Sequence, residues 1–533
     1  MRLSGRWLLT FWPAAALLLL LLAPMTRLAW EGWAGGDVSA ASSSHLWVLW
    51  QDEYLRWRLL WSVMQAALTC VAALAVGLPV AWVLARFEFA GRTWVLRLLM
   101  LPFVVPTLVA AMGVLALWGP IGALGGGESD DNPWLLLYGN LFFNLCLVVR
   151  AGVDALSQVS RQRVDAARTL GATPWRAFWR VEWPAILPWL ASSLCLVFLY
   201  CFSGFGLALV LGGQRYATIE VEIYTLVAHE LNLAQASVLG LWMLMLTGSV
   251  ALAYAAIERR LSAPARPDPV PRQRPRRFTQ WAAVLVALAA LFVICAAPLL
   301  AIFWKAAQAG WGAWSQVLEA EALDALFNTL RFSAAALVMG TLLGLAHALA
   351  AQRSLWWRTA AFLPLIASPV TVAFGLLLLY PEATASLALL LAAYTLLAYP
   401  FVAKSVAAGL DGLPASWGMA ARTLGATPWR VFWRVTLPLL RPALRRGMAF
   451  AAATSLGEFA VTLFLSRPEW ATLTTLIYQH LGRPGQAHQE AAWVLSCVLM
   501  ALALLAFVLI EWPARARLPG QQLAQAHAGL NHA

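Results

Sequence analysis

The chain has 533 residues, of which 61% are hydrophobic and only 12% charged, and its formal net charge is +12. So little polar surface excludes a soluble globular protein of this size. We attribute the positive charge to the inner face of a membrane rather than to binding of nucleic acid.

Apolar segments long enough to cross a bilayer, which takes about 20 residues, recur in two sets of six. The predicted fold is therefore all-α and polytopic, with twelve transmembrane helices in two tandem six-helix halves. The predicted spans are 8–29, 59–84, 96–118, 134–152, 189–211, 238–257, 281–303, 326–350, 360–380, 386–403, 443–465 and 493–511.

A charged, proline-rich segment separates the two sets. Residues 258–280 contain five prolines and seven arginines, a composition that builds no packed core and is typical of a linker. We therefore divide the chain into a first membrane half at 1–257, a cytoplasmic linker at 258–280, a second half at 281–512 and a cytoplasmic tail at 513–533.

The distribution of basic residues predicts the orientation. With the N-terminus in the cytoplasm, most Lys and Arg residues fall on the cytoplasmic side, as the positive-inside rule requires, and the C-terminus is cytoplasmic as well. The first apolar run is interpreted as a retained span, because Pro24 and Arg27 stand where a signal peptide would be cleaved. The six cysteines lack CxxC spacing and the seven histidines are scattered, so no metal site is expected.

One phrase occurs twice, at 166–181 and 420–435, and the copies agree at fifteen of sixteen positions. Each copy predicts a helix, a turn and a second helix. Gly171 and Gly425 suit the left-handed end of the first helix, while Thr173-Pro174 and Thr427-Pro428 suit the start of the second. The second helix gathers tryptophan and phenylalanine on one face, as is typical at a membrane interface.

The phrase resembles the EAA loop of permease subunits of binding-protein-dependent ABC importers of type I. The resemblance covers Asp165 to Pro184 and Met419 to Pro438, within loops that we place at 152–188 and 404–442. It implies that coupling helices in these loops dock on a pair of ATPase subunits. Met419 replaces the acid of the motif, so the halves dock unequally if that acid contacts the ATPase. The residues implied for coupling are Asp165, Ala166, Ala167, Gly171, Ala420, Ala421 and Gly425.

The chain has no phosphate-binding loop of its own. Its only lysines, Lys305 and Lys404, lie outside any GxxxxGK pattern, and no nucleophile and base occur together in the loops. We therefore expect no enzyme activity and no bound cofactor, with ATP hydrolysed on the separate subunit.

The fused twelve-span layout resembles permeases for thiamine and its phosphates and, more loosely, those for ferric iron. It implies a bacterial inner-membrane protein that receives thiamine or thiamine phosphates from a periplasmic binding protein. The stretches that resemble the thiamine group are 50–54, 142–144, 211–213, 217–220, 223–224 and 455–459.

Glu458 lies inside an apolar span, where an ionisable group is costly unless it faces a cavity or a partner. Its carboxylate either assists the passage of a cationic thiazolium, aided by aromatic rings, or bonds to a neighbouring span. The equivalent position of the first half is Gly204. We expect Glu220 and Glu222 to be solvated contacts for the binding protein.

Two other classes remain as alternatives. A major facilitator-type transporter has the same six-plus-six layout, but it should carry ionisable residues through both halves. A membrane-embedded enzyme needs a catalytic constellation, for which the sequence offers no candidate.

Overall fold

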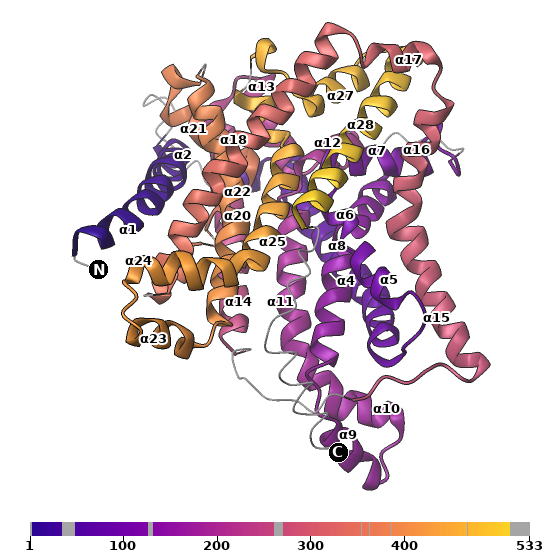
Figure 1. The fold of residues 1–533 in the computed structure, drawn as a ribbon. Helices are drawn as coiled ribbons and strands as arrows, with labels where there is room; N and C mark the ends of the chain where they lie inside the picture. The colour runs from indigo at the N-terminus through magenta and orange to yellow at the C-terminus, as the bar shows by residue number, and fades with distance from the viewer. Residues whose placement is uncertain are drawn as a thin grey trace.

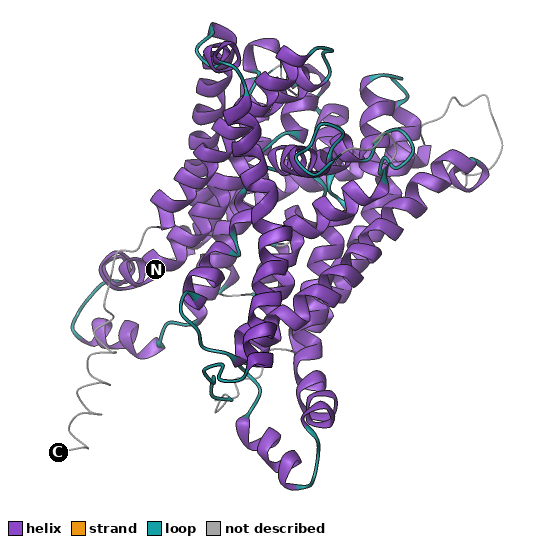
Figure 2. Cartoon of the chain, turned by 90° about the vertical axis from the view of Figure 1, so that its right-hand side faces the viewer, coloured by secondary structure: helices purple, strands orange, loops and turns teal. Residues whose placement is uncertain are grey.

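The structure is a computed structural model that describes residues 3–34, 48–125, 132–260, 270–352, 354–361, 363–384, 386–465 and 467–511. In these ranges the regular structure is helical, apart from one isolated bridge between Phe87 and Gln273 (Figures 1 and 2). Nine of the described helices are long and apolar enough to cross a membrane, or ten if one bent pair is a single span. The all-α polytopic class is confirmed.

The described residues of the first half form fourteen α-helices in chain order, besides the π-helical turns. They are α1 (Leu3–Leu17), α2 (Ala23–Ala34), α3 (Val48–Gln51), α4 (Glu53–Arg86), α5 (Arg92–Leu98), α6 (Leu101–Val104), α7 (Thr107–Trp118), α8 (Pro133–Leu156), α9 (Arg161–Thr169), α10 (Pro174–Ala177), α11 (Trp183–Phe202), α12 (Phe205–Leu211), α13 (Ile219–Ala228) and α14 (Leu233–Arg260). The last of these extends three residues into the segment that we predicted as linker.

The second half repeats this order. Its helices are α15 (Phe278–Leu291), α16 (Ala297–Gln308), α17 (Trp311–Gln316), α18 (Ala320–Ala351), α19 (Leu355–Ala360), α20 (Leu363–Ile366), α21 (Pro369–Leu379), α22 (Leu387–Asp411), α23 (Ala415–Thr423), α24 (Pro428–Val431), α25 (Leu437–Leu456), α26 (Ala460–Leu465), α27 (Leu473–Leu481) and α28 (Gln486–Glu511). From α8 and α22 onward, equivalent positions in the two halves are 254 residues apart.

The count of twelve unbroken spans is not reproduced among the described residues. The predicted span 96–118 bends by 105° between α6 and α7, and 360–380 is divided among α19, α20 and α21. Each break precedes a proline: Val105 and Ser368 have extended ψ angles of 135° and 144°, as a residue before proline prefers. The predicted spans 189–211 and 443–465 are also interrupted, after Phe202 and Leu456.

In the part of the chain that the structure describes, four π-helical turns also precede prolines. They occupy Leu18–Leu22, Phe178–Glu182, Phe292–Ala296 and Phe432–Thr436. Each is followed by a helix with proline at its second residue. Proline lacks an N–H and crowds the carbonyl four residues back, so a widened turn at that point lets the chain continue as a helix.

The first span of each half packs on the other half. A Cβ atom added to Gly375 on α21 would lie 3.1 Å from the Pro24 carbonyl oxygen on α2, and one added to Gly113 on α7 would lie 3.0 Å from that of Pro298 on α16. The two close approaches are matched, and Tyr380 adds a hydrogen bond of 3.0 Å to the Leu19 carbonyl. The halves are therefore interlocked.

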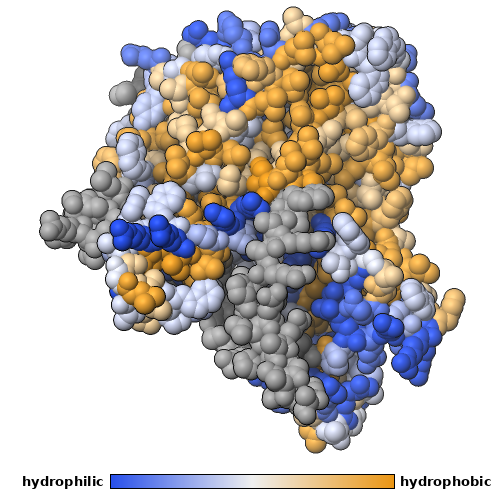
Figure 3. Space-filling model, in the orientation of Figure 1, coloured by the Kyte–Doolittle hydropathy of each residue, from blue (hydrophilic) through white to orange (hydrophobic). Residues whose placement is uncertain are grey.

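The surface is consistent with a bilayer around the helices. Figure 3 shows apolar side chains over much of the body, with hydrophilic side chains gathered near both ends. The described end of the predicted linker packs on the loop that follows α4. Gln273 exchanges backbone hydrogen bonds with Arg86 and Glu88, and Arg272 forms an ion pair with Glu88 at 3.1 Å. Residues 261–269 and the predicted tail 513–533 lie outside the described residues.

Candidate functional site

Two helical hairpins, α9–α10 and α23–α24, extend from one end of the bundle, opposite α13 and α27 (Figure 1). In both, the first helix ends as predicted, with Gly171 at φ +84° and Gly425 at φ +81°. Ala172 donates its N–H to the Ala167 carbonyl at 3.1 Å, and Gly171 donates to Arg168 at 3.0 Å. This pair of bonds is a Schellman motif, and the second hairpin repeats it.

The second helix of each hairpin is capped as the sequence predicted. The Thr173 and Thr427 hydroxyls accept the N–H groups of Arg176 and Arg430. From Pro174 the helix continues through a π turn into α11, so that Pro174–Phe202 forms one span of 29 residues. The first hairpin is thus continuous with a transmembrane helix. The second continues through a π turn into α25 in the same way.

A buried ion pair ties the first hairpin to a second span. Arg86 at the end of α4 lies 2.6 Å from Glu182, and both side chains are largely buried.

The tryptophans predicted on the second helix of each hairpin do cluster. The ring centroids of Trp175 and Trp179 are 5.5 Å apart, and those of Trp429 and Trp433 are also 5.5 Å apart.

The residues implied for coupling lie on the exposed face of these hairpins. Asp165, Ala166, Gly171, Ala420 and Gly425 are exposed, and Ala167 and Ala421 are half-buried. Their role in docking stays a prediction. The halves differ here: Asp165 pairs with Arg161 at 3.1 Å, whereas the exposed Met419 stands in its place.

Sequence reasoning missed the most exposed apolar residues of the hairpins. Leu170 and Leu424 are 88% and 89% exposed at the tips, each directly before the left-handed glycine. A leucine with so little contact to its own chain is a ready anchor for a partner. The identity of this residue in both copies was the available signal.

A cavity of about 200 Å³ lies between the halves, and Glu458 is one of its lining residues. Glu458 is 7% exposed. Its Oε1 accepts the Val461 N–H at 2.9 Å, and its carbonyl accepts the Thr474 hydroxyl at 3.0 Å. We call this space the central cavity. Its walls come from α6–α8, α11 and α12 of the first half and from α20, α21, α22, α25 and neighbouring loops of the second.

A larger space of about 570 Å³, the vestibule, lies nearer the hairpins. Asp411, at the end of α22, and Arg358 line it and form an ion pair. Tyr200 lines both spaces, so the vestibule adjoins the central cavity.

Aromatic rings connect the central cavity with the opposite end. Phe205 and Phe459, which are equivalent positions, stack across the two halves with centroids 5.7 Å apart. Phe205 contacts Tyr224 on α13, and Phe459 contacts Tyr478 on α27. The four rings form a symmetric cluster that fills the space on this side of the cavity.

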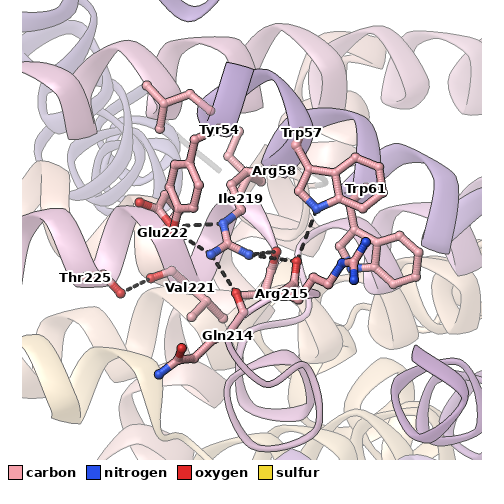
Figure 4. Close-up of polar contacts among 12 residues, drawn as sticks. Tyr54, Trp57, Arg58, Trp61, Gln214, Arg215, Ile219, Val221, Glu222 and Thr225 are labelled. Carbon is pink, nitrogen blue, oxygen red and sulfur yellow. Dashed lines mark hydrogen bonds and ion pairs between the residues drawn. The ribbon is translucent and has the colours of Figure 1, made fainter. Parts of the chain in front are cut away.

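The prediction for Glu220 and Glu222 is wrong, because both are buried. Glu222 lies 3.2 Å from the Arg58 guanidinium and accepts the Tyr54 hydroxyl at 2.9 Å (Figure 4). Burial raises the pKa of Glu222, while Tyr54 and Arg58 oppose that rise. Burial likewise raises the pKa of Glu220 well above its usual range.

Arg58 also holds the loop before α13. It donates to the carbonyls of Gln214, Arg215 and Ala217 at 2.7, 3.1 and 3.3 Å (Figure 4). Trp57 donates to the Arg215 carbonyl at 3.1 Å. We call this set of contacts the outer clamp. Its parts are far apart in the sequence, which explains why local patterns did not predict it.

Two interlocked membrane halves, a cavity between them and exposed hairpins that continue into long helices define the membrane component of a solute transporter. The sequence profile of the family described as binding-protein-dependent transport system inner membrane component matches residues 77–263 and 336–517, one match in each half. The chain belongs to this family.

Curated relatives match over most of the chain. The thiamine transport system permease protein ThiP of Escherichia coli K12 is 29% identical over 90% of this chain and 92% of its own length. The protein of that name from Haemophilus influenzae is 27% identical over 90% and 93%. A crystal structure of a bacterial alginate ABC transporter, in complex with an alginate pentasaccharide-bound periplasmic protein, gives 19% identity, coverage of 49% of this chain and 99% of that chain, and a TM-score of 0.40. At that TM-score the likeness carries no argument.

Proposed function

We propose that this chain forms both halves of the membrane permease of an ABC importer for thiamine or thiamine phosphates. The similarity to thiamine permeases along both halves supports the substrate. The observation that carries the transport mechanism is the pair of matched hairpins, each with an exposed tip and a direct continuation into a long helix, α11 or α25. A periplasmic binding protein delivers the substrate, and two separate ATPase subunits bind the hairpins.

Catalysis has no part in this proposal for the chain itself. ATP is bound and hydrolysed on the partner subunits, and the permease needs no cofactor. When the ATPase subunits close, they move the hairpins, and α11 and α25 move with them because each continues directly from the second helix of its hairpin. The halves then part on the side of the aromatic cluster and close around the vestibule.

The hairpin end is cytoplasmic in this proposal, together with both chain termini. A reporter fused after Pro269 should be active in the cytoplasm, and one fused near Asp130 should be active in the periplasm. The reversed pattern would contradict the orientation and the docking of a cytoplasmic ATPase.

The direct test is substitution of the glycine at a hairpin tip. Gly425→Asp forces a side chain into a left-handed conformation, which costs about 1 kcal/mol or more, and places it on the docking face. We expect thiamine uptake to be abolished and the ATPase to be lost on purification, with membrane insertion intact. Gly418→Ala, a helical position with open space around it, is the matched control. Full uptake and full ATPase association in Gly425→Asp would refute the coupling role.

A further inference from the structure

The central cavity is lined by aromatic side chains and by no basic side chain among the described residues. Five aromatic residues contribute to its walls, from both halves of the chain, and the described residues that line it include no lysine, arginine or histidine. Aromatic faces attract cations through their quadrupoles. The aromatic lining residues are Phe103, Phe143, Tyr200, Phe205 and Phe401.

Glu458 is the one acidic residue among the described residues that line this wall, and its carboxylate adds a negative charge there when it is ionised. None of the ion pairs among the described residues includes it. A carboxylate buried without a cationic partner is expensive. A cation that enters the cavity supplies the missing counter-charge.

Capping alone does not account for Glu458. Its Oε1 accepts the Val461 N–H at the start of α26, but glutamate is not among the preferred N-cap residues. The equivalent helix of the first half, α12, begins after Gly204 with no side-chain cap. The short helix therefore forms without a carboxylate, and the charge at position 458 has another use.

Asn144 is a second polar residue of the cavity wall, and its amide must turn for Oδ1 to reach a molecule in the cavity. Its Nδ2 donates to the Asn140 carbonyl and to Cys201 Sγ. Its Oδ1 is buried and has no hydrogen-bond partner among the described residues. The residue is 1% exposed and lines the cavity. An orphan acceptor of this kind costs free energy until a donor meets it.

We infer that the central cavity is a transit site for a planar organic cation that also carries a hydrogen-bond donor. Glu458 provides the counter-charge, the aromatic rings face the cationic ring, and Asn144 Oδ1 accepts the donor. This inference deepens the proposed function, since thiamine combines a cationic thiazolium ring with an aminopyrimidine. It places substrate recognition inside the permease as well as on the binding protein.

The test compares three variants of the permease–ATPase complex in proteoliposomes with the binding protein. Glu458→Gln keeps an acceptor for the Val461 N–H but removes the charge, and Asn144→Leu removes the acceptor. Thr462→Val is the matched control, because its buried hydroxyl bonds to Tyr394 nearby without lining the cavity. We measure uptake of thiamine, uptake of a neutral thiophene isostere of thiamine, melting temperature and ATPase association.

We expect thiamine uptake by Glu458→Gln to fall by about tenfold or more, while the isostere is taken up as by the wild type. Asn144→Leu should lower uptake of both compounds, and Thr462→Val should lower neither selectively. The melting temperature of Glu458→Gln should match the wild type.

Two results would overturn the inference. One is unchanged thiamine uptake in Glu458→Gln, and the other is an equal loss for both compounds in proportion to a lower melting temperature, which would make Glu458 a structural cap. Failure of the wild-type complex to take up thiamine would instead refute the proposed function, so the two failures are distinguishable.

Discussion

Equivalent outer loops, at 214–217 in the first half and 468–471 in the second, are held in place by different side-chain contacts. In the first half, Arg58 reaches three backbone carbonyls and pairs with the buried Glu222. In the second, the amide of Asn328 donates to the carbonyls of Glu469 and Ala471 at 3.0 and 2.8 Å, and both contacts join neutral groups.

The hydroxyls below these contacts are matched. Ser62 accepts the Ile219 N–H at 2.8 Å, and Thr329 accepts the Leu473 N–H at 2.9 Å. Ile219 and Leu473 are equivalent positions. The same backbone arrangement is therefore stabilised by a charged side chain, Arg58, in the first half and by a neutral one, Asn328, in the second. A buried ion pair carries a desolvation penalty, and loss of one partner leaves the other charge unpaired. The first half should therefore be the more sensitive to single substitutions.

The largest expected effect follows from Arg58→Leu. This change leaves Glu222 buried without its cation, for which about 3 to 5 kcal/mol of destabilisation is typical. We expect a clear fall in the melting temperature of the detergent-solubilised permease. A fall no greater than that of Arg56→Leu, a half-buried arginine of the same helix outside the clamp, would show that the outer clamp contributes little.

Loss of the neutral contact in the second half should destabilise the protein less than loss of Arg58. Asn328→Ala removes two hydrogen bonds to backbone carbonyls without stranding a charge, so we expect about 1 to 3 kcal/mol. The measurement is the same melting experiment, made in parallel with Arg58→Leu. Equal effects at the two sites would mean that the ion pair adds nothing to the sensitivity of the first half.

A smaller loss of stability is expected from Tyr54→Phe, which tests the contribution of one hydroxyl beside the outer clamp. Tyr54→Phe removes the hydroxyl that donates to Glu222 but leaves the ion pair with Arg58. Because the tyrosine is half exposed, water replaces part of the lost bond, and we expect about 0.5 to 1.5 kcal/mol. A loss as large as that of Arg58→Leu would place the tyrosine, rather than the ion pair, at the centre of the clamp.

The smallest effect on stability is expected at the hairpins, where the halves also differ. The Arg161–Asp165 pair is exposed, so Asp165→Ala should change stability by less than about 0.5 kcal/mol. ATPase association should nevertheless fall if the acid contacts the partner, while Met419→Ala tests the other half. No change in association for Asp165→Ala would remove the acid from the docking face.

The sequence predicted best what depends on neighbouring residues. Gly171 with Ala172, and Thr173 with Pro174, determine the hairpin locally, and the structure reproduces both turns. The prolines that break the spans were visible as well, but hydropathy alone merged the segments on either side. The burial of Glu222 depends on Arg58, on a different helix, and no local pattern records such a partner.

The interlocked first spans have a consequence for the order of synthesis. The chain from α2 to α21, its packing partner, takes roughly 17 to 70 s to translate at about 5 to 20 residues per second. During that interval the surface that will receive Gly375 is bordered by lipid, which suits a helix with exposed leucines such as Leu18 and Leu19. Because the two halves are fused, α2 and its later-synthesised partner α21 belong to the same molecule.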